Sequence, residues 1–179
     1  MQIIPINSAK GAQIEQAASV LIEALREFST GWGDLDSARV ETQTFLTSER
    51  LAFLALEDDV TVGWIGGIRH TGDLWELHPL VVLPEWQSKG IGTQLVLRLE
   101  AEARKEGVTT IWLGTDDDFG GTNLYGRELY PDVLQQLATL RAISKHPFTF
   151  YQRIGYTVAG VIPDASGPGK PDILMVKRI

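Results

Sequence analysis

Near the N-terminus, apolar residues follow a helical spacing. They recur every three or four positions, as they do on a helix with one buried face. They are Ile14, Ala17, Leu21, Leu25 and Phe28. We expect this helix to follow a short strand, Ile3–Ile6, to have Asn7 or Ser8 as its N-cap, and to end at Gly31 and Gly33.

A second, shorter helix and three strands are expected next. Asp36 or Ser37 would cap the helix, and its apolar positions would be Val40 and Phe45. The predicted strands are apolar runs bounded by polar turns. They are Leu51–Glu57, Val60–Arg69 and Trp75–Val82. Because proline cannot donate a ladder hydrogen bond, Pro79 predicts a bulge or a sheet edge in the third of these strands.

In the C-terminal half, helical and strand patterns alternate. A helix should open at Gly90 and end at Gly107, with one apolar stripe. That stripe consists of Ile91, Leu95, Leu99 and Ala103. The other expected elements are the strands Val108–Gly114, Tyr156–Ile162 and Asp172–Lys177 and the helices Pro131–Ile143 and Pro147–Ile154. This order predicts an α/β fold with a mixed, twisted central sheet and helices on both faces.

Size and charge narrow the class of protein. The 179 residues are the length of one domain, so we expect a single domain over 1–179. The 16 basic and 23 acidic residues give a net charge of -7 without a Lys/Arg run, which favours a cationic partner over nucleic acid. No stretch of about 18 apolar residues occurs, and the N-terminus lacks the pattern of a signal peptide. We therefore expect no membrane span and a cytoplasmic location.

The residue types also limit the chemistry. The chain has no cysteine, which excludes disulfides, thiolate metal sites and cysteine nucleophiles. The three histidines, His70, His78 and His146, lack the spacing of metal ligands. We expect no metal site.

Gln87–Gly92 lies between a predicted strand and the start of a predicted helix. Helix N-termini present N–H groups and a positive dipole end, which suit a pyrophosphate. Gly90 and Gly92 would let phosphates approach closely, and Lys89 would add a charge. The segment is neither a P-loop nor a complete dinucleotide fingerprint. A glycine-rich turn before a surface helix is the alternative.

The pattern Gln-x-x-Gly-x-Gly in this segment resembles the acyl-CoA loop of the GNAT superfamily of N-acetyltransferases. Phe150–Tyr156 resembles that superfamily's Phe-Tyr-x-x-x-Gly-Phe/Tyr segment. Within the superfamily, several further segments resemble aminoglycoside 6'-N-acetyltransferases. They are Trp75–Val82, Leu113–Asp117, Leu129–Asp132, His146–Phe148 and Gly169–Asp172. The resemblance implies two splayed central strands, acetyl-CoA as co-substrate, direct acetyl transfer to a primary amine, and a homodimer.

The resemblance also implies which residues bind the co-substrate. The backbone of Val81 and Val82 would pair with the pantetheine amides, and Asn123 would contact pantetheine further along. The loop and the first helical turn would hold the pyrophosphate. Their residues are Gln87, Ser88, Lys89, Gly90, Ile91, Gly92 and Thr93.

Four residues are implied in catalysis. The Leu80 N–H would face the thioester oxygen, and Tyr151 would donate to the departing thiolate. Glu76 and His78, two apart on a strand, should share one face with Leu80 and could take up the amine's proton. Which of the two acts as base stays open, and a solvated strand face or a mutual Glu–His pair is the alternative. For Tyr151, the alternative is a core aromatic.

Carboxylates would hold a cationic substrate. Asp116, the first of three consecutive aspartates after a strand, is favoured, with Glu76 and Asp172 as further candidates. A hydrated acidic loop is the alternative. Trp32 would either stack on a sugar ring or cover the core.

These inferences predict an enzyme that transfers acetyl from acetyl-CoA to the 6'-amine of an aminoglycoside, an antibiotic-resistance activity. One alternative is a GNAT enzyme for another amine, such as a polyamine, a peptide or a small metabolite. The other is a non-catalytic acyl-CoA sensor, which would need the loop but not Glu76, His78 and Tyr151.

Overall fold

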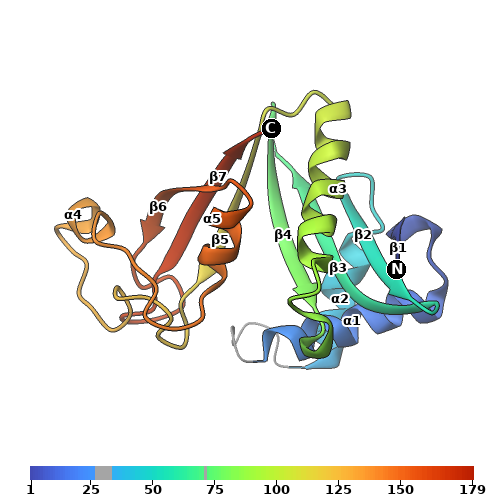
Figure 1. Cartoon of the computed structure of the whole chain (residues 1–179), viewed down its shortest axis with the longest axis horizontal. Coiled ribbons are helices and arrows are strands. Elements are labelled where there is room, and N and C mark those ends of the chain that lie inside the picture. The colour runs from blue at the N-terminus through green and yellow to red at the C-terminus, as the bar shows by residue number, and fades with distance from the viewer. Residues whose placement is uncertain (27–33, 71) are drawn as a thin grey trace. The chain divides into compact units, whose positions relative to one another are not determined.

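The computed structural model describes residues 1–26, 34–70 and 72–179 and divides them into two compact units (Figure 1). The first unit comprises the described residues up to Ile111 together with Ile179, and the second runs from Trp112 to Arg178. Both units combine helices with strands, so the chain has the predicted mixed α/β character. A single domain over 1–179 and a splay between the two central strands stay predictions.

Four antiparallel strands form the sheet of the first unit, in the order β1-β2-β3-β4. The strands are β1 (Gln2–Pro5), β2 (Arg50–Glu57), β3 (Val60–Arg69) and β4 (Leu74–Val82). The helices of this unit are α1 (Gly11–Leu25), α2 (Leu35–Thr44) and α3 (Ile91–Lys105), with short 3-10 turns at Ile6–Ser8 and Pro84–Trp86.

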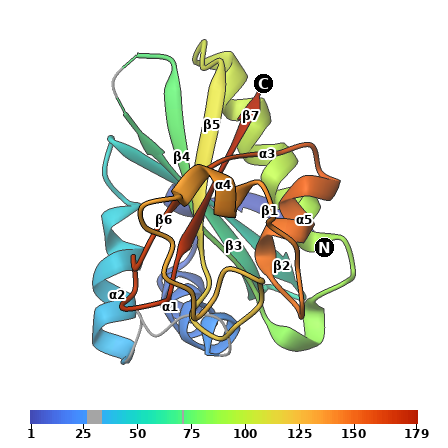
Figure 2. The ribbon, with the colours of Figure 1, turned by 90° about the vertical axis from the view of Figure 1, so that its left-hand side faces the viewer.

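In the second unit the strand order is β5-β7-β6, and β6 and β7 are antiparallel. Its elements are β5 (Thr110–Asp116), α4 (Val133–Leu137), α5 (Pro147–Arg153), β6 (Thr157–Ile162) and β7 (Asp172–Arg178). The chain passes from the first unit to the second within β5. Figure 2 looks onto α4 and α5 of the second unit.

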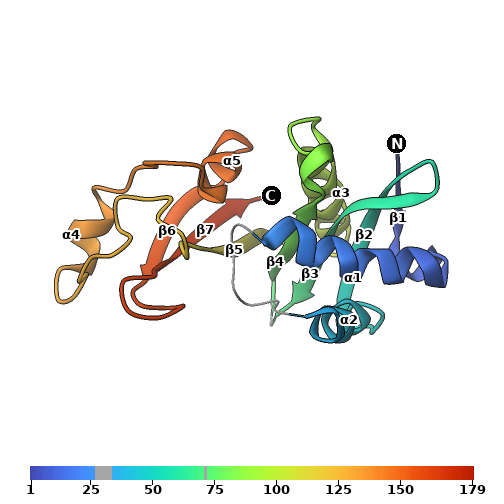
Figure 3. The ribbon, with the colours of Figure 1, turned by 90° about the horizontal axis from the view of Figure 1, so that it is seen from below.

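Helices cover both faces of the first unit's sheet, as predicted (Figure 3). On one face, Leu54 pairs with Trp64, whose Nε1 donates to the Ala17 carbonyl of α1 at 2.9 Å. On the other face a Cβ at Gly67 would lie 2.7 Å from Leu99 Cδ1 of α3. The stripe predicted for α3 is fully confirmed, because all four of its residues are buried.

One extra residue in β4 forms the predicted bulge near Pro79. Ile65 pairs with Leu80 and Gly67 pairs with Leu77, so a two-residue step on β3 opposes a three-residue step on β4. The His78-Pro79 peptide within this step is cis. The bulge reverses the alternation of side chains along β4.

The reversal separates residues that were expected to share a face. Glu76 lies before the bulge opposite Ile68, on the face covered by α1 and α2, and His78 follows on that same face. Leu80 lies after the bulge beside Ile65, on the face covered by α3. The prediction that Leu80 shares a face with Glu76 and His78 is therefore wrong.

The N-cap of α2 lies earlier than predicted. Asp34, not Asp36 or Ser37, caps the helix, because its carboxylate accepts the Ser37 N–H at 2.8 Å. The buried positions of α2 are Ala38 and Thr42, whereas Val40 is 65% exposed. Val40 lies in the helix as predicted but points to solvent, and Phe45, the C-cap residue, is buried.

Other boundaries differ from those predicted. Residues Ile6–Ser8 form a 3-10 turn, so the N-cap of α1 is Lys10 rather than Asn7 or Ser8. The strand expected at Val108–Gly114 runs from Thr110 to Asp116. Only Val133–Leu137 of the helix expected at Pro131–Ile143 is helical. Gly31 and Gly33 lie outside the described residues. In the described ranges, no helix has both the length and the apolar content needed to cross a bilayer.

A substitution at Gly66 tests how closely the end of α2 packs on the sheet. A Cβ there would overlap the His78 carbonyl oxygen and the Phe45 ring. We expect Gly66→Ala to lower the free energy of unfolding by roughly 1–3 kcal/mol, because overpacking forces the backbone to shift. Gly11→Ala is the control, since nothing lies within 4 Å of a Cβ there. Urea unfolding with equal midpoints for both variants would contradict this account.

Candidate functional site

The loop before α3 has the backbone of an anion-binding turn. Ser88 and Gly90 both have left-handed backbone, with φ of 61° and 83°. A Cβ at Gly90 would meet nothing within 4 Å. No side chain caps α3, and its first turn contains no acidic residue. The positive end of this 15-residue helix is therefore not compensated by a side chain, which suits a pyrophosphate group.

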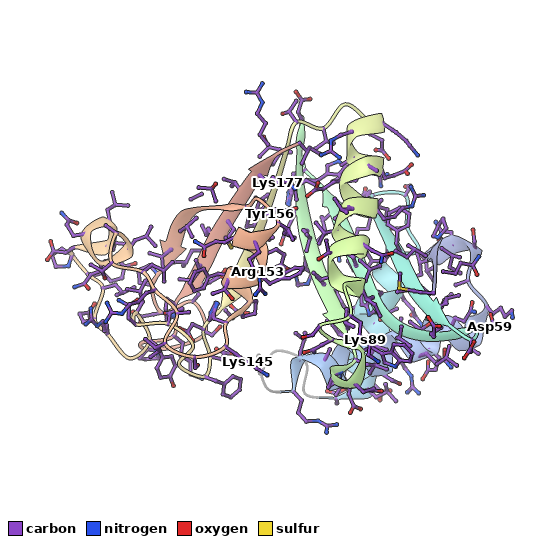
Figure 4. The ribbon with its side chains drawn as sticks, in the orientation of Figure 1. Asp59, Lys89, Lys145, Arg153, Tyr156 and Lys177 are labelled. Carbon is purple, nitrogen blue, oxygen red and sulfur yellow. The ribbon has the colours of Figure 1, made fainter. Side chains whose placement is uncertain are left out.

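Two side chains fix this loop from within. Gln87 Nε2 donates to the Val82 carbonyl at 3.0 Å, which ties the loop to the end of β4. The Lys89 ammonium lies 4.2 Å from the centre of the Trp86 ring (Figure 4). The loop thus has a defined shape and carries a cation at its edge, as a phosphate-binding role requires.

Three of the remaining predicted co-substrate residues of this unit are buried. Ile91, Val81 and Val82 are 4%, 2% and 9% exposed, so their side chains belong to the core. Gly92 and Thr93 lie in the first turn of α3. These positions are compatible with the backbone contacts that were predicted, which stay predictions.

Glu76 and His78 each contact a partner that the sequence did not indicate. Glu76 Oε2 lies 2.9 Å from His70 Nε2, and His78 Nε2 lies 3.7 Å from Glu41 Oε1 of α2. Arg50 Nη1 contacts the same Glu41 oxygen at 3.0 Å. Among the described residues of the first unit, this face therefore holds two histidine–carboxylate pairs and one guanidinium.

Tyr151 is buried in an aromatic cluster of the second unit. Its ring centre lies 5.1 Å from that of Phe150 and 5.6 Å from that of Tyr156, both in edge-on arrangements. Burial raises the pKa of the Tyr151 phenol above its ordinary value. The hydroxyl therefore keeps its proton at neutral pH and can act as a hydrogen-bond donor.

The acidic loop of the second unit is folded around Asp117. The buried Asp117 carboxylate accepts the Gly121 N–H at 2.6 Å and the Thr122 N–H at 2.8 Å. A cavity of about 310 Å³ lies beside this loop, lined in part by Asp116, Asp118 and Lys145. Asp117 therefore has a structural role, and Asp116 is the exposed carboxylate at the cavity.

Asp172 and Asp116 lie on the same face of this unit. Gly114 and Asp116 are two apart on β5, so they point to one side of the strand. A Cβ at Gly114 would overlap the Asp172 carboxylate, which places that carboxylate over Gly114. Ser166 Oγ contacts Asp116 Oδ1 at 3.3 Å. Two predicted substrate-binding carboxylates are thus brought together from distant parts of the sequence.

Asn123 and Trp32 are the remaining residues that were predicted to bind a ligand. Asn123 Nδ2 donates to the Thr139 carbonyl at 3.1 Å, and its Oδ1 accepts the Arg141 N–H at 2.7 Å. Its amide holds the chain after α4, and a contact with pantetheine stays a prediction. Trp32 lies outside the described residues. Within the described ranges, no group of three or more His, Asp and Glu side chains could hold a metal ion.

Comparison with known proteins gives concordant matches. The model of the acetyltransferase (GNAT) family matches residues 18–129. The chain is similar to an aminoglycoside 6'-N-acetyltransferase solved with coenzyme A, at 37% identity and a TM-score of 0.90. It is also 37% identical to the aminoglycoside 6'-N-acetyltransferase from Enterococcus faecium, with a TM-score of 0.88. Each of these matches covers 99% of this chain and 97% of the other. A search of curated proteins found no match.

His146 should make stability depend on pH. Its Nδ1 accepts the Phe148 N–H at 3.2 Å and so caps α5. Burial lowers the pKa of His146 below 6.5, and the negative charge of Asp117 only partly opposes this. As the pH falls below 6.5, the unfolded chain binds a proton that the folded imidazole does not, so stability decreases.

We expect the melting temperature to fall more steeply between about pH 7 and 5.5 for the wild type than for His146→Asn. Asparagine keeps a capping oxygen but does not titrate in this range. Parallel melting curves for the two proteins across this range would refute the prediction.

Proposed function

Because the chain belongs to the acetyltransferase (GNAT) family, we propose that it transfers the acetyl group of acetyl-CoA to the 6'-amine of an aminoglycoside. The observation that carries this proposal is the likeness, over 99% of the chain, to two 6'-N-acetyltransferases at 37% identity. Such an activity would inactivate the drug and confer antibiotic resistance.

Acetyl-CoA supplies an activated thioester, and the chain's own residues bind and orient it. The turn through Ser88 and Gly90 and the N-terminus of α3 fit its pyrophosphate, because uncapped N–H groups favour an anion there. In this proposal the backbone of Val81 and Val82 pairs with pantetheine, and Asn123 contacts it further along. The Leu80 N–H donates to the thioester oxygen as negative charge develops on it.

In this proposal Tyr151 donates a hydrogen bond to the departing thiolate. Its buried, protonated phenol supports the role, because a hydroxyl that keeps its proton at neutral pH remains a hydrogen-bond donor to sulfur. Glu76 and His78 receive the amine. Asp116 and Asp172, with Trp32, hold other parts of a cationic substrate, and the shared face of the two aspartates supports this.

Two other functions remain distinct hypotheses. A GNAT enzyme for a polyamine, peptide or small metabolite would use the same loop and Tyr151 but a different amine. A non-catalytic acyl-CoA sensor would bind the co-substrate without releasing thiol. The expected homodimer and cytoplasmic location stay predictions.

A panel of amines tests the proposed function. We expect thiol release from acetyl-CoA with 6'-amino aminoglycosides and none above background with matched 6'-hydroxy analogues, which lack the acceptor. Release with other amines alone would support the second hypothesis and refute the first. If no amine gives release but acetyl-CoA still binds in a titration, the sensor hypothesis is favoured.

Tyr151→Phe tests the role of the phenol. We expect kcat to fall by about 100-fold with little change in the Kd of acetyl-CoA, because only the hydrogen-bond donor to the departing thiolate is lost. Tyr156→Phe, in the same ring cluster, is the matched control and should stay within about twofold of wild type. Equal turnover in both variants would remove Tyr151 from the reaction.

A further inference from the structure

The orientation of α2 about its own axis places Glu41 against the sheet. Val40 points to solvent, and the side chain of Glu41 is only 17% exposed. Its carboxylate contacts Arg50 Nη1 at 3.0 Å, and the same Nη1 donates to Thr44 Oγ1 at 2.9 Å. The Glu41 side chain is therefore held by an arginine of β2, which Thr44 of α2 holds in turn.

The held carboxylate faces His78. Glu41 Oε1 lies 3.7 Å from His78 Nε2, an ion-pair distance for a protonated imidazole. The other titratable or charged groups described on this face are Arg50, His70 and Glu76. His70 and Glu76 lie 2.9 Å apart, so the Glu76 carboxylate already faces an imidazole.

We propose that Glu41 is a positioning residue that enables His78, rather than Glu76, to take the proton from the attacking amine. The inference rests on the proposed function, since it concerns the same reaction. At 3.7 Å from His78 Nε2, the Glu41 carboxylate is placed to stabilise the imidazolium that forms when Nδ1, on the other side of the ring, takes up the proton. A carboxylate beside a catalytic histidine stabilises the imidazolium in the same way.

The proton transfer balances without a further reactant. The substrate ammonium gives one proton to His78 Nδ1, which leaves a neutral amine and an imidazolium next to Glu41. The amine nitrogen then forms the amide bond while the carbon–sulfur bond breaks, and the second nitrogen proton goes to the departing thiolate, which becomes the thiol of CoA. The imidazolium returns its proton to water. Glu76 binds the cation in this scheme and does not change its protonation state.

Glu41→Gln tests the inference, with Glu15→Gln as its matched control. Both substitutions remove a carboxylate paired with an arginine, but Glu15 pairs with Arg39. We expect Glu41→Gln to lower kcat by roughly 10- to 100-fold without changing the KM for acetyl-CoA, and Glu15→Gln to stay within about twofold. Glu41→Asp should recover part of the lost activity, because it restores the charge.

The double variant separates positioning from a structural effect. Once His78→Ala has removed the base, adding Glu41→Gln should lower kcat no further. A further loss equal to that in the wild-type background would overturn the inference, as would a Glu41→Gln enzyme as active as Glu15→Gln. Thermal unfolding of each variant shows whether the fold is retained. A wild-type enzyme that acetylates no amine would instead overturn the proposed function, and this inference with it.

Discussion

The extra residue in β4 is the constraint on which the first unit's site depends. Without it, the alternation of the strand would carry Glu76, His78 and Leu80 on one face of the sheet. With it, Glu76 and His78 lie under α1 and α2, while Leu80 lies on the side of α3. A single bulge thus places the two side chains proposed for proton transfer and the residue proposed to face the thioester on opposite faces of one strand.

Each proposed functional group is held by a neighbour that has no direct part in the chemistry. Glu41 is fixed by Arg50, Glu76 by His70, and the acidic loop by the two N–H bonds to Asp117. In the second unit, His146 caps α5, the short helix that carries Tyr151. Such supporting contacts restrict the side chains to few rotamers, which is what precise positioning requires.

Features determined locally were predictable from the sequence, and features determined by distant contacts were not. The position of α3 was predicted correctly from the spacing of its apolar residues and from the glycines at its two ends. These signals lie in the helix or directly beside it. The bulge in β4 was predicted from Pro79, because proline has no N–H to donate to the sheet. The N-cap of α2 was placed at Asp36 or Ser37 rather than at Asp34, because each of the three is a residue type that can cap a helix and the sequence does not distinguish between them.

The candidate site follows the same division. The anion-binding turn is one continuous segment, so its pattern was visible in the sequence. Glu41 and His70 were missed because their contacts with His78 and Glu76 exist only once α2 and the β3–β4 hairpin are folded. The helix expected over Pro131–Ile143 stops early because the Asn123 amide binds backbone groups at Thr139 and Arg141, a contact 16 to 18 residues away.

The turn before α3 also bears on how the catalytic cycle ends. In the proposed function, backbone N–H groups of this turn bind the phosphate part of acetyl-CoA, which is the same in free CoA. Such a site would not distinguish substrate from product, so free CoA would compete with acetyl-CoA for it. Preference for the loaded carrier has to come from the few atoms of the acetyl group near Leu80. In that case, tight binding of the phosphates would also slow the release of CoA, and turnover would depend on that release.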